Sequence, residues 1–234
     1  MEARSHGAVA PAGHHRGGAG IDVVPLGTGN LLAANLGIPS GLDAASDAGR
    51  APVRQIDLAY ANGEAFAVMA GSGFDALMIR DADDTTKSRL GTLAYVLSAI
   101  RHLRLPLVLT TVVVDGKPWF TGRTSMVLVA NHGTMSGGLD VFPDAAPDDG
   151  LLDVGVLAAT GVRQWAGVFL RLLAGRAQSS DLVRMTQGRT ISVRTNRPRA
   201  WELDGEDRAP TTDLEFTLQP GALRVHDRND RSNP

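Results

Sequence analysis

Three two-residue turn signals constrain this chain more than any other feature, and each is an Asn or Asp followed by Gly: Asn62-Gly63, Asp115-Gly116 and Asp204-Gly205. Both residues of a tight hairpin turn take positive φ, which Asn, Asp and Gly tolerate best. Apolar and β-branched runs flank the first two turns, at residues 53–60, 65–70, 107–114 and 119–131. These runs are predicted to pair as antiparallel strands, and further short strands are expected at 151–157, 189–195, 200–203, 213–218 and 223–226.

Residues 25–39, PLGTGNLLAANLGIP, predict a strand end, a glycine turn and a helix. Gly27 and Gly29 let backbone N–H groups approach a ligand closely. The positive end of the new helix points at the same place, which suits a phosphate or a polar ring. A glycine turn before a helix is more often only a turn, so the pattern by itself leaves both interpretations open.

Two further segments have helical spacing. In residues 89–103, one apolar face lies among several basic residues, which suits either a lipid surface or ordinary core packing. In the second segment, Thr160 is expected to cap a helix that turns five side chains inward: Val162, Trp165, Phe169, Leu172 and Leu173. Core packing is the favoured interpretation for both helices, and a lipid-facing role is the less favoured alternative for each.

Composition narrows the classes of function. Of 234 residues, 43% are hydrophobic and 21% charged, and a net charge of −2 gives no indication of binding to nucleic acid or to an anionic membrane. The absence of cysteine excludes disulfides, thiolate metal sites and cysteine nucleophiles, and fits a reducing compartment. No apolar run reaches the roughly 18 residues of a membrane span. Residues 1–20 lack the apolar core of a signal peptide and are predicted to be a disordered tail.

Acidic residues recur beside the expected strands and turns. Asp57 lies within an alternating strand, and Asp75 follows a strand end in the sequence GSGFD. Asp149 belongs to a glycine-rich, acidic stretch. Asp204 and Glu206, two residues apart at a turn, suit the binding of Mg²⁺ or the removal of a proton from a hydroxyl, although a plain hairpin turn explains them as well.

The order of these segments is more specific than any one of them. PLGTGN, the aspartate of IDL, GSGFDA, RLG at a helix start, NHGTMSGG with PDAAPDDGLLDV, and ELDGE follow one another along residues 22–225. This series resembles the bacterial diacylglycerol kinase family, which is related to the sphingosine kinases and more distantly to the NAD kinases. The resemblance implies an α+β fold in which the remnant of an α/β nucleotide-binding domain precedes a β-sandwich-type domain with two helices.

The same resemblance implies an ATP-dependent lipid kinase. In this family the active site lies in the cleft between the two domains, Mg²⁺ bridges the phosphates, and a lipid hydroxyl attacks the γ-phosphate. Gly27, Thr28 and Asn30 match the turn that lies against the nucleotide. Asp57 matches an aspartate of the network that reaches Mg²⁺ through water.

Four further residues take expected roles from the resemblance. Asp204 matches the proposed general base, and Glu206 matches the glutamate that assists at the metal. Asp149, with the carbonyl of Leu151, resembles a structural cation site. Asp75 falls near the position at which the related sphingosine kinases contact the lipid head group.

The chain also departs from the family pattern. The family has a GGDGT phosphate loop and about a hundred residues of α/β domain before PLGTGN, a typical domain length, whereas about twenty residues stand there in this chain. Leu31 occupies a position where the family often has an aspartate. We therefore expect an N-terminally truncated member with a tail, a nucleotide-domain remnant, a sandwich domain, and a final strand with its tail: 1–20, 21–56, 57–219 and 220–234.

Two functions remain open at this point. The protein either phosphorylates a diacylglycerol-like lipid, or it is an inactive remnant that binds lipid or a partner. An NAD kinase relative is disfavoured because Asn131-His132 matches the dinucleotide motif of those enzymes poorly. The lipid kinase interpretation implies a cytoplasmic protein in peripheral contact with the membrane and without a nucleic-acid partner. Unpaired strand edges near residues 21–26 would favour a homodimer. Replacing Asp204 by Asn is expected to abolish activity with little loss of stability.

Overall fold

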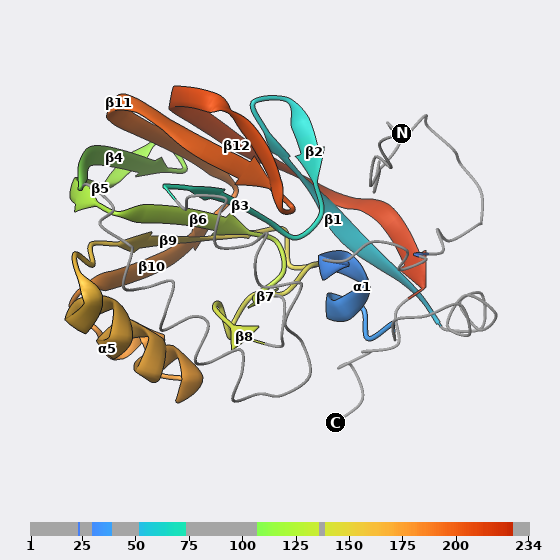
Figure 1. Cartoon of the computed structure of the whole chain (residues 1–234). Coiled ribbons are helices and arrows are strands. Elements are labelled where there is room, and N and C mark those ends of the chain that lie inside the picture. The colour runs from blue at the N-terminus through green and yellow to red at the C-terminus, as the bar shows by residue number, and fades with distance from the viewer. Residues whose placement is uncertain (1–22, 24–29, 39–51, 74–106, 136–138, 227–234) are drawn as a thin grey trace, which may run out of the picture.

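The computed structural model describes residues 23, 30–38, 52–73, 107–135 and 139–226. Most of these residues form one antiparallel sheet, in the order β10-β9-β6-β3-β11-β12-β1-β2, which β4 and β5 join through β11 (Figure 1). The strands are β1 (Val53–Ala61), β2 (Glu64–Phe66), β3 (Met69–Ser72), β4 (Val108–Val114), β5 (Lys117–Thr124), β6 (Met126–Ala130), β7 (Thr134–Met135), β8 (Leu139–Asp140), β9 (Leu152–Leu157), β10 (Val183–Gly188), β11 (Thr190–Leu203) and β12 (Glu206–His226). The helices are α1 (Leu31–Asn35), α5 (Val162–Leu173) and the short 3-10 helix η2 (Ala177–Ser179).

Strand β11 joins two groups of strands because it is long enough to pair with a different neighbour at each end. Its residues 191–195 pair with β4, whereas residues 201–203 pair with β3. The pairing with β12 along its other edge is irregular between Arg194 and Trp201, where the change of neighbour occurs. Strands β4 and β5 are therefore attached to the first part of β11, and strands β3, β6, β9 and β10 to its last part.

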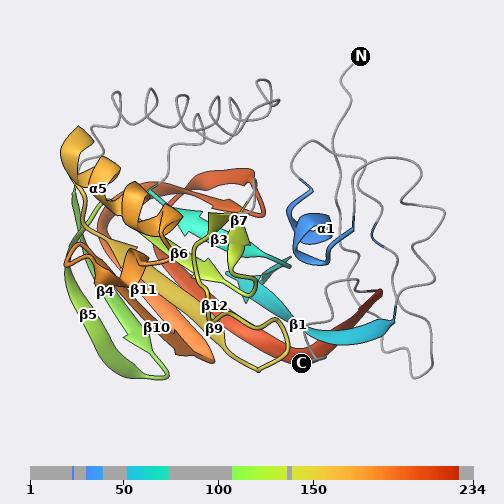
Figure 2. The same ribbon diagram turned by 90° about the horizontal axis from the view of Figure 1, so that it is seen from below.

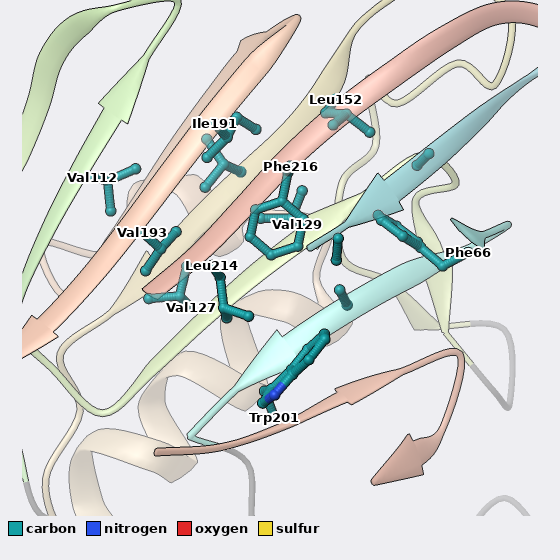
Figure 3. Close-up of a cluster of buried hydrophobic side chains, with 14 of the residues drawn as sticks. Phe66, Val112, Val127, Val129, Leu152, Ile191, Val193, Trp201, Leu214 and Phe216 are labelled. Atoms are coloured by element: carbon teal, nitrogen blue, oxygen red, sulfur yellow. The ribbon is translucent and has the colours of Figure 1, made fainter. Parts of the chain in front are cut away.

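The main hydrophobic core lies between these two groups of strands (Figure 3). Val112 of β4 and Ile191 of β11 point into the same interior as Val129 of β6. Phe66 and Phe216 meet edge to face, with ring centroids 6.3 Å apart. A core shared by facing strands is the arrangement of a β-sandwich.

A second apolar cluster, called the outer cluster below, lies on the opposite face of β3 and β6, since residues alternate between faces along a strand. It consists of Ala67, Val68, Met69, Leu128, Ala130, Val141 and Phe142. Leu31 and Leu32 from α1 and Leu172 from α5 pack against it. Asn35 holds α1 in place by donating from Nδ2 to the Thr134 carbonyl at 2.8 Å. Both helices therefore rest on the face that carries residues 67–69.

The predicted α+β class, mostly antiparallel sheet with two helices, is confirmed. At the three Asn-Gly and Asp-Gly turns named above, both residues have positive φ, between +47° and +89°. The predicted strands at 53–60, 107–114 and 151–157 correspond to β1, β4 and β9. The predicted helix at 89–103 lies outside the described residues.

Strand boundaries differ from prediction where the chain passes between strand groups. The expected strand 119–131 divides at Ser125, because β5 pairs with β4 whereas β6 pairs with β3 and β9. The expected strand 65–70 divides at residues 67–68 for the same reason. Conversely, the short strands predicted after residue 189 merge into β11 and β12. Strands β1 and β12 run across the domain boundaries predicted at 56/57 and 219/220, so no strand end marks either boundary.

Helix α5 differs most from its prediction. Gly161 holds the N-cap position, and Thr160 instead contacts the Gln164 Oε1 atom through its backbone N–H at 2.6 Å. Trp165 is buried as expected, but Val162 and Leu173 are exposed. Trp165 packs against Leu157 at the end of β9 and against Ala159. Val168 joins the same cluster, so it faces inward although the sequence did not predict this.

Candidate active site

Among the predicted site residues that the structure describes, Asp57 is the most completely buried, at 2% exposure. It lies where β1 and β12 lose register, since Ile56 pairs with Leu223 but Leu58 pairs with Gln219. Its carboxylate fills the resulting bulge by accepting hydrogen bonds from the N–H of Gly221 at 2.7 Å and of Gly150 at 2.8 Å. One side chain therefore fixes both the irregular part of β12 and the loop before β9.

Asp204 occupies the tip of the β11–β12 hairpin with φ of +47°. Its Oδ1 accepts hydrogen bonds from the N–H groups of Val68 at 2.9 Å and Met69 at 3.0 Å, and its Oδ2 accepts one from Ala67 at 2.8 Å. Burial raises the pKa of the Asp204 carboxyl, while these three N–H groups oppose the rise by stabilising the carboxylate, and the charge of Glu206 adds to it. The carboxylate is therefore held rigidly at the crossing between β2 and β3.

Asn131 connects the two aspartates through the backbone. It follows β6, is 1% exposed, and donates from Nδ2 to the carbonyl of Asp57 at 3.0 Å and to that of Ala67 at 3.3 Å. Ala67 is also the residue whose N–H binds Asp204. Two aspartates that are far apart in sequence are thus linked through the backbone of residues 57 and 67 in one hydrogen-bonded unit.

Glu206 lies on the exposed side of the same hairpin. Its Oε2 accepts a hydrogen bond from Arg208 at 3.3 Å, and Arg208 also binds Glu64 at 2.8 Å. These contacts place Glu206 in a surface ion-pair network with Arg208. The predicted role of Glu206 at a metal stays a prediction.

Asp149 lies next to the loop that Asp57 holds. Its Oδ1 accepts a hydrogen bond from the N–H of Leu151 at 2.9 Å. Burial raises the pKa of Asp149, and the charges of Asp57 and Asp148 add to the rise. Burial also raises the pKa of nearby Asp153 to about 6, although a hydrogen bond from Gln187 opposes the change.

The predicted nucleotide and lipid residues are described only in part. Gly27, Thr28 and Asp75 lie outside the described residues, so their roles stay predictions. Asn30 stands directly before α1 with φ of +36°, and its carbonyl accepts the N–H of Ala34 at 2.9 Å. Within the described residues, no three acidic or histidine side chains are grouped as metal ligands.

Glu202 was not singled out from the sequence, yet it is a second buried carboxyl group beside Asp204. It is 6% exposed, and its Oε1 would lie 3.0 Å from a Cβ atom added to Gly71 on β3. Burial raises the pKa of Glu202 to about 7, with smaller contributions from the charges of Asp207 and Asp204. Within the described part of the chain its carboxyl group has no hydrogen-bond or ion-pair partner. The sequence shows this Glu two positions before Asp204, but it gives no signal of the burial.

Residues 68–227 match the family model described as the YegS C-terminal NAD kinase beta sandwich-like domain. The chain belongs to the YegS-like lipid kinase family. A relative in Pseudomonas fluorescens named "Probable lipid kinase YegS-like" is 32% identical over 209 residues, which cover 89% of this chain and 69% of that protein. The diacylglycerol kinase of Bacillus subtilis is 30% identical over 191 residues, which cover 80% of this chain and 62% of that protein.

The fold of this YegS-like chain is also found in a crystal structure of a diacylglycerol kinase from Bacillus anthracis. The TM-score is 0.63 at 20% identity, and the match covers 87% of this chain and 65% of that one. The chain thus spans about two thirds of the length of these relatives. The predicted membership of the diacylglycerol kinase family is confirmed.

None of the helices in the described residues has the length and apolar character needed to cross a bilayer.

Proposed function

We propose that this YegS-like chain acts as an ATP-dependent kinase that transfers the γ-phosphate to a hydroxyl group of diacylglycerol or a similar lipid. The observation that carries the proposal is the unit of Asp204, residues 67–69, Asn131 and Asp57, which fixes two acidic groups in relation to one another. Phosphoryl transfer depends mainly on positioning and on the neutralisation of charge, and a rigid carboxylate suits that task.

The hydrogen bonds of Asp204 leave room for one more donor. A carboxylate offers about four acceptor positions. Oδ1 uses two of them for Val68 and Met69, and Oδ2 uses one for Ala67. The remaining position on Oδ2 would accept the hydroxyl proton of the lipid while the hydroxyl oxygen forms its bond to the γ-phosphorus. The bond from that phosphorus to the bridging oxygen breaks, and ADP leaves with the electron pair.

Mg²⁺ would neutralise the negative charge of the phosphates when it is bound. Asp57 suits an indirect contact, since each of its oxygens accepts one backbone hydrogen bond and keeps further acceptor capacity for a water molecule. The described residues offer no complete ligand set of their own. Asp57 would therefore position a metal-bound water, and the phosphates would supply the direct ligands.

Loss of activity in the Asp204→Asn variant tests the proposal. Transfer of labelled phosphate from ATP to diacylglycerol in mixed micelles is expected for the wild-type chain and is expected to fall about a hundredfold in the variant. Asn also lacks one acceptor oxygen for three backbone N–H groups, so a loss of about 2 kcal/mol in stability is expected, contrary to the sequence-based prediction. Activity must be measured well below the melting temperature of the variant.

Asp207→Asn is the matched control, because Asp207 is exposed on the same hairpin. This variant is expected to keep wild-type activity. A wild-type chain that transfers no phosphate to any lipid hydroxyl would overturn the proposal. Undiminished transfer by a folded Asp204→Asn variant would remove Asp204 as the proton acceptor.

A further inference from the structure

Helix α5 has a much wider apolar surface than its core contacts require. Its buried residues Trp165 and Val168, together with the partly buried Leu172, lie three or four positions apart and so share one face. Val162, Leu170 and Leu173 are nevertheless 42%, 62% and 52% exposed. At 100° per residue these three side chains form a second stripe along the helix, beside the buried one.

The charged side chains on α5 itself are all basic. Arg163 and Arg171 lie on the polar side of α5 and are exposed, and Arg176 follows the helix end. The helix contains no acidic residue. An exposed apolar stripe flanked by arginines is the pattern of a helix that lies in the plane of a membrane interface.

The exposed fractions of Val162, Leu170 and Leu173 show that this stripe is accessible. In both views the helix lies on the outside of the sheet, next to β9 and β10 and away from α1 (Figures 1 and 2). Its inner side continues through Leu172 into the outer cluster, which includes Val68 and Met69. The N–H groups of those two residues bind Asp204. A surface bound to α5 would therefore be joined to the candidate active site through one packed cluster.

We propose that the outer face of α5 (Val162, Leu170 and Leu173 with Arg163 and Arg171) docks on an anionic lipid bilayer. The leucines would enter the boundary between head groups and acyl chains, and the arginines would bind lipid phosphates. The net charge of −2 provides no general attraction to such a surface, so binding depends on this face. A second copy of the same face is disfavoured because its arginines would repel one another. The inference rests on the proposed function, which requires contact with a lipid.

Sedimentation with vesicles tests the docking surface. The wild-type chain is expected to bind vesicles of equal parts phosphatidylglycerol and phosphatidylcholine, and to bind phosphatidylcholine vesicles much more weakly. The double variant Leu170→Asp, Leu173→Asp is expected to lower the affinity for the anionic vesicles at least about tenfold. Leu109→Asp is the matched control, because Leu109 is a 47% exposed leucine on β4. Its affinity is expected to match that of the wild type.

Equal vesicle affinity of the wild type and the double variant would overturn the proposal, and so would equal losses in the double variant and the Leu109 control. A shift from dimer to monomer in the double variant with unchanged vesicle binding would assign the face to a second copy instead. The kinase assay separates this inference from the proposed function. Activity on a short-chain lipid below its micelle concentration is expected to be unchanged in the double variant. If vesicle binding depends on α5 while no lipid is phosphorylated, docking stands and the proposed function falls.

Discussion

Replacing Asp57 by Ala is expected to lower the free energy of unfolding by about 4 kcal/mol. The carboxylate is 2% exposed and accepts backbone hydrogen bonds from Gly150 and Gly221. Removing it leaves two partly buried N–H groups without an acceptor, and each costs about 1–3 kcal/mol. The bulge between β1 and β12 also loses the side chain that fills it, which adds a cavity cost of the order of 1 kcal/mol.

Urea unfolding followed by circular dichroism measures this loss. Asp148→Ala provides the comparison, since Asp148 lies in the same region and forms an exposed ion pair with Arg54 at 2.8 Å. Such a pair contributes at most about 1 kcal/mol. Similar urea midpoints of unfolding for Asp57→Ala and Asp148→Ala would show that the bulge does not depend on the Asp57 carboxylate. Asp57→Asn should fall between wild type and alanine, because an amide keeps one acceptor oxygen.

Asp57 also shows which parts of the candidate site could be predicted from the sequence. The order of motifs singled out this aspartate and Asp204, and the structure joins both through Asn131. Nothing in the sequence indicates that the register of β12 shifts by two residues opposite Asp57. That shift depends on pairing between strands more than 160 residues apart in the chain, for example Ile56 with Leu223, and local propensity carries no information on such contacts.

The turns were predictable for the opposite reason. Asn62-Gly63, Asp115-Gly116 and Asp204-Gly205 specify their own backbone conformation through positive φ, and all three are realised. Strand ends such as Ser125 were not predictable, because they mark where the chain leaves one group of strands for the other.

Helix α5 was predicted as a helix, but the predicted inward face was too wide, because it included the exposed Val162 and Leu173. Its apolar residues cover both the core side and an exposed side, so periodicity cannot say which part of a wide apolar arc faces the core. The excess apolar arc, which the sequence assigned to the core, is the feature that supports membrane docking.

Between pH 5 and pH 8, the stability of the chain is expected to fall by about 4 kcal/mol as the pH rises. Folding raises the pKa of Glu202 from 4.5 to about 7 and that of Asp153 from 3.8 to about 6, in both cases mainly through burial. The folded state therefore holds protons that the unfolded state has already released at these pH values. Stability is full below the ordinary pKa values and is lost as the pH rises through the folded ones. The raised pKa values of Asp149 and Asp204 act in the same direction.

The variant Glu202→Gln isolates the larger part of this effect. A neutral amide resembles the protonated carboxyl group, so the variant is expected to match the wild type at pH 5 and to exceed its stability by about 3 kcal/mol at pH 8. Thermal melts in buffers of equal ionic strength provide the measurement. The variant Asp181→Asn removes an exposed carboxyl group, and its stability is expected to change with pH in the same way as that of the wild type. If Glu202→Gln keeps the pH dependence of the wild type, the carboxyl group over Gly71 ionises as freely in the folded state as in the unfolded state. Glu202 would then not be the buried acid beside Asp204 that the structure describes.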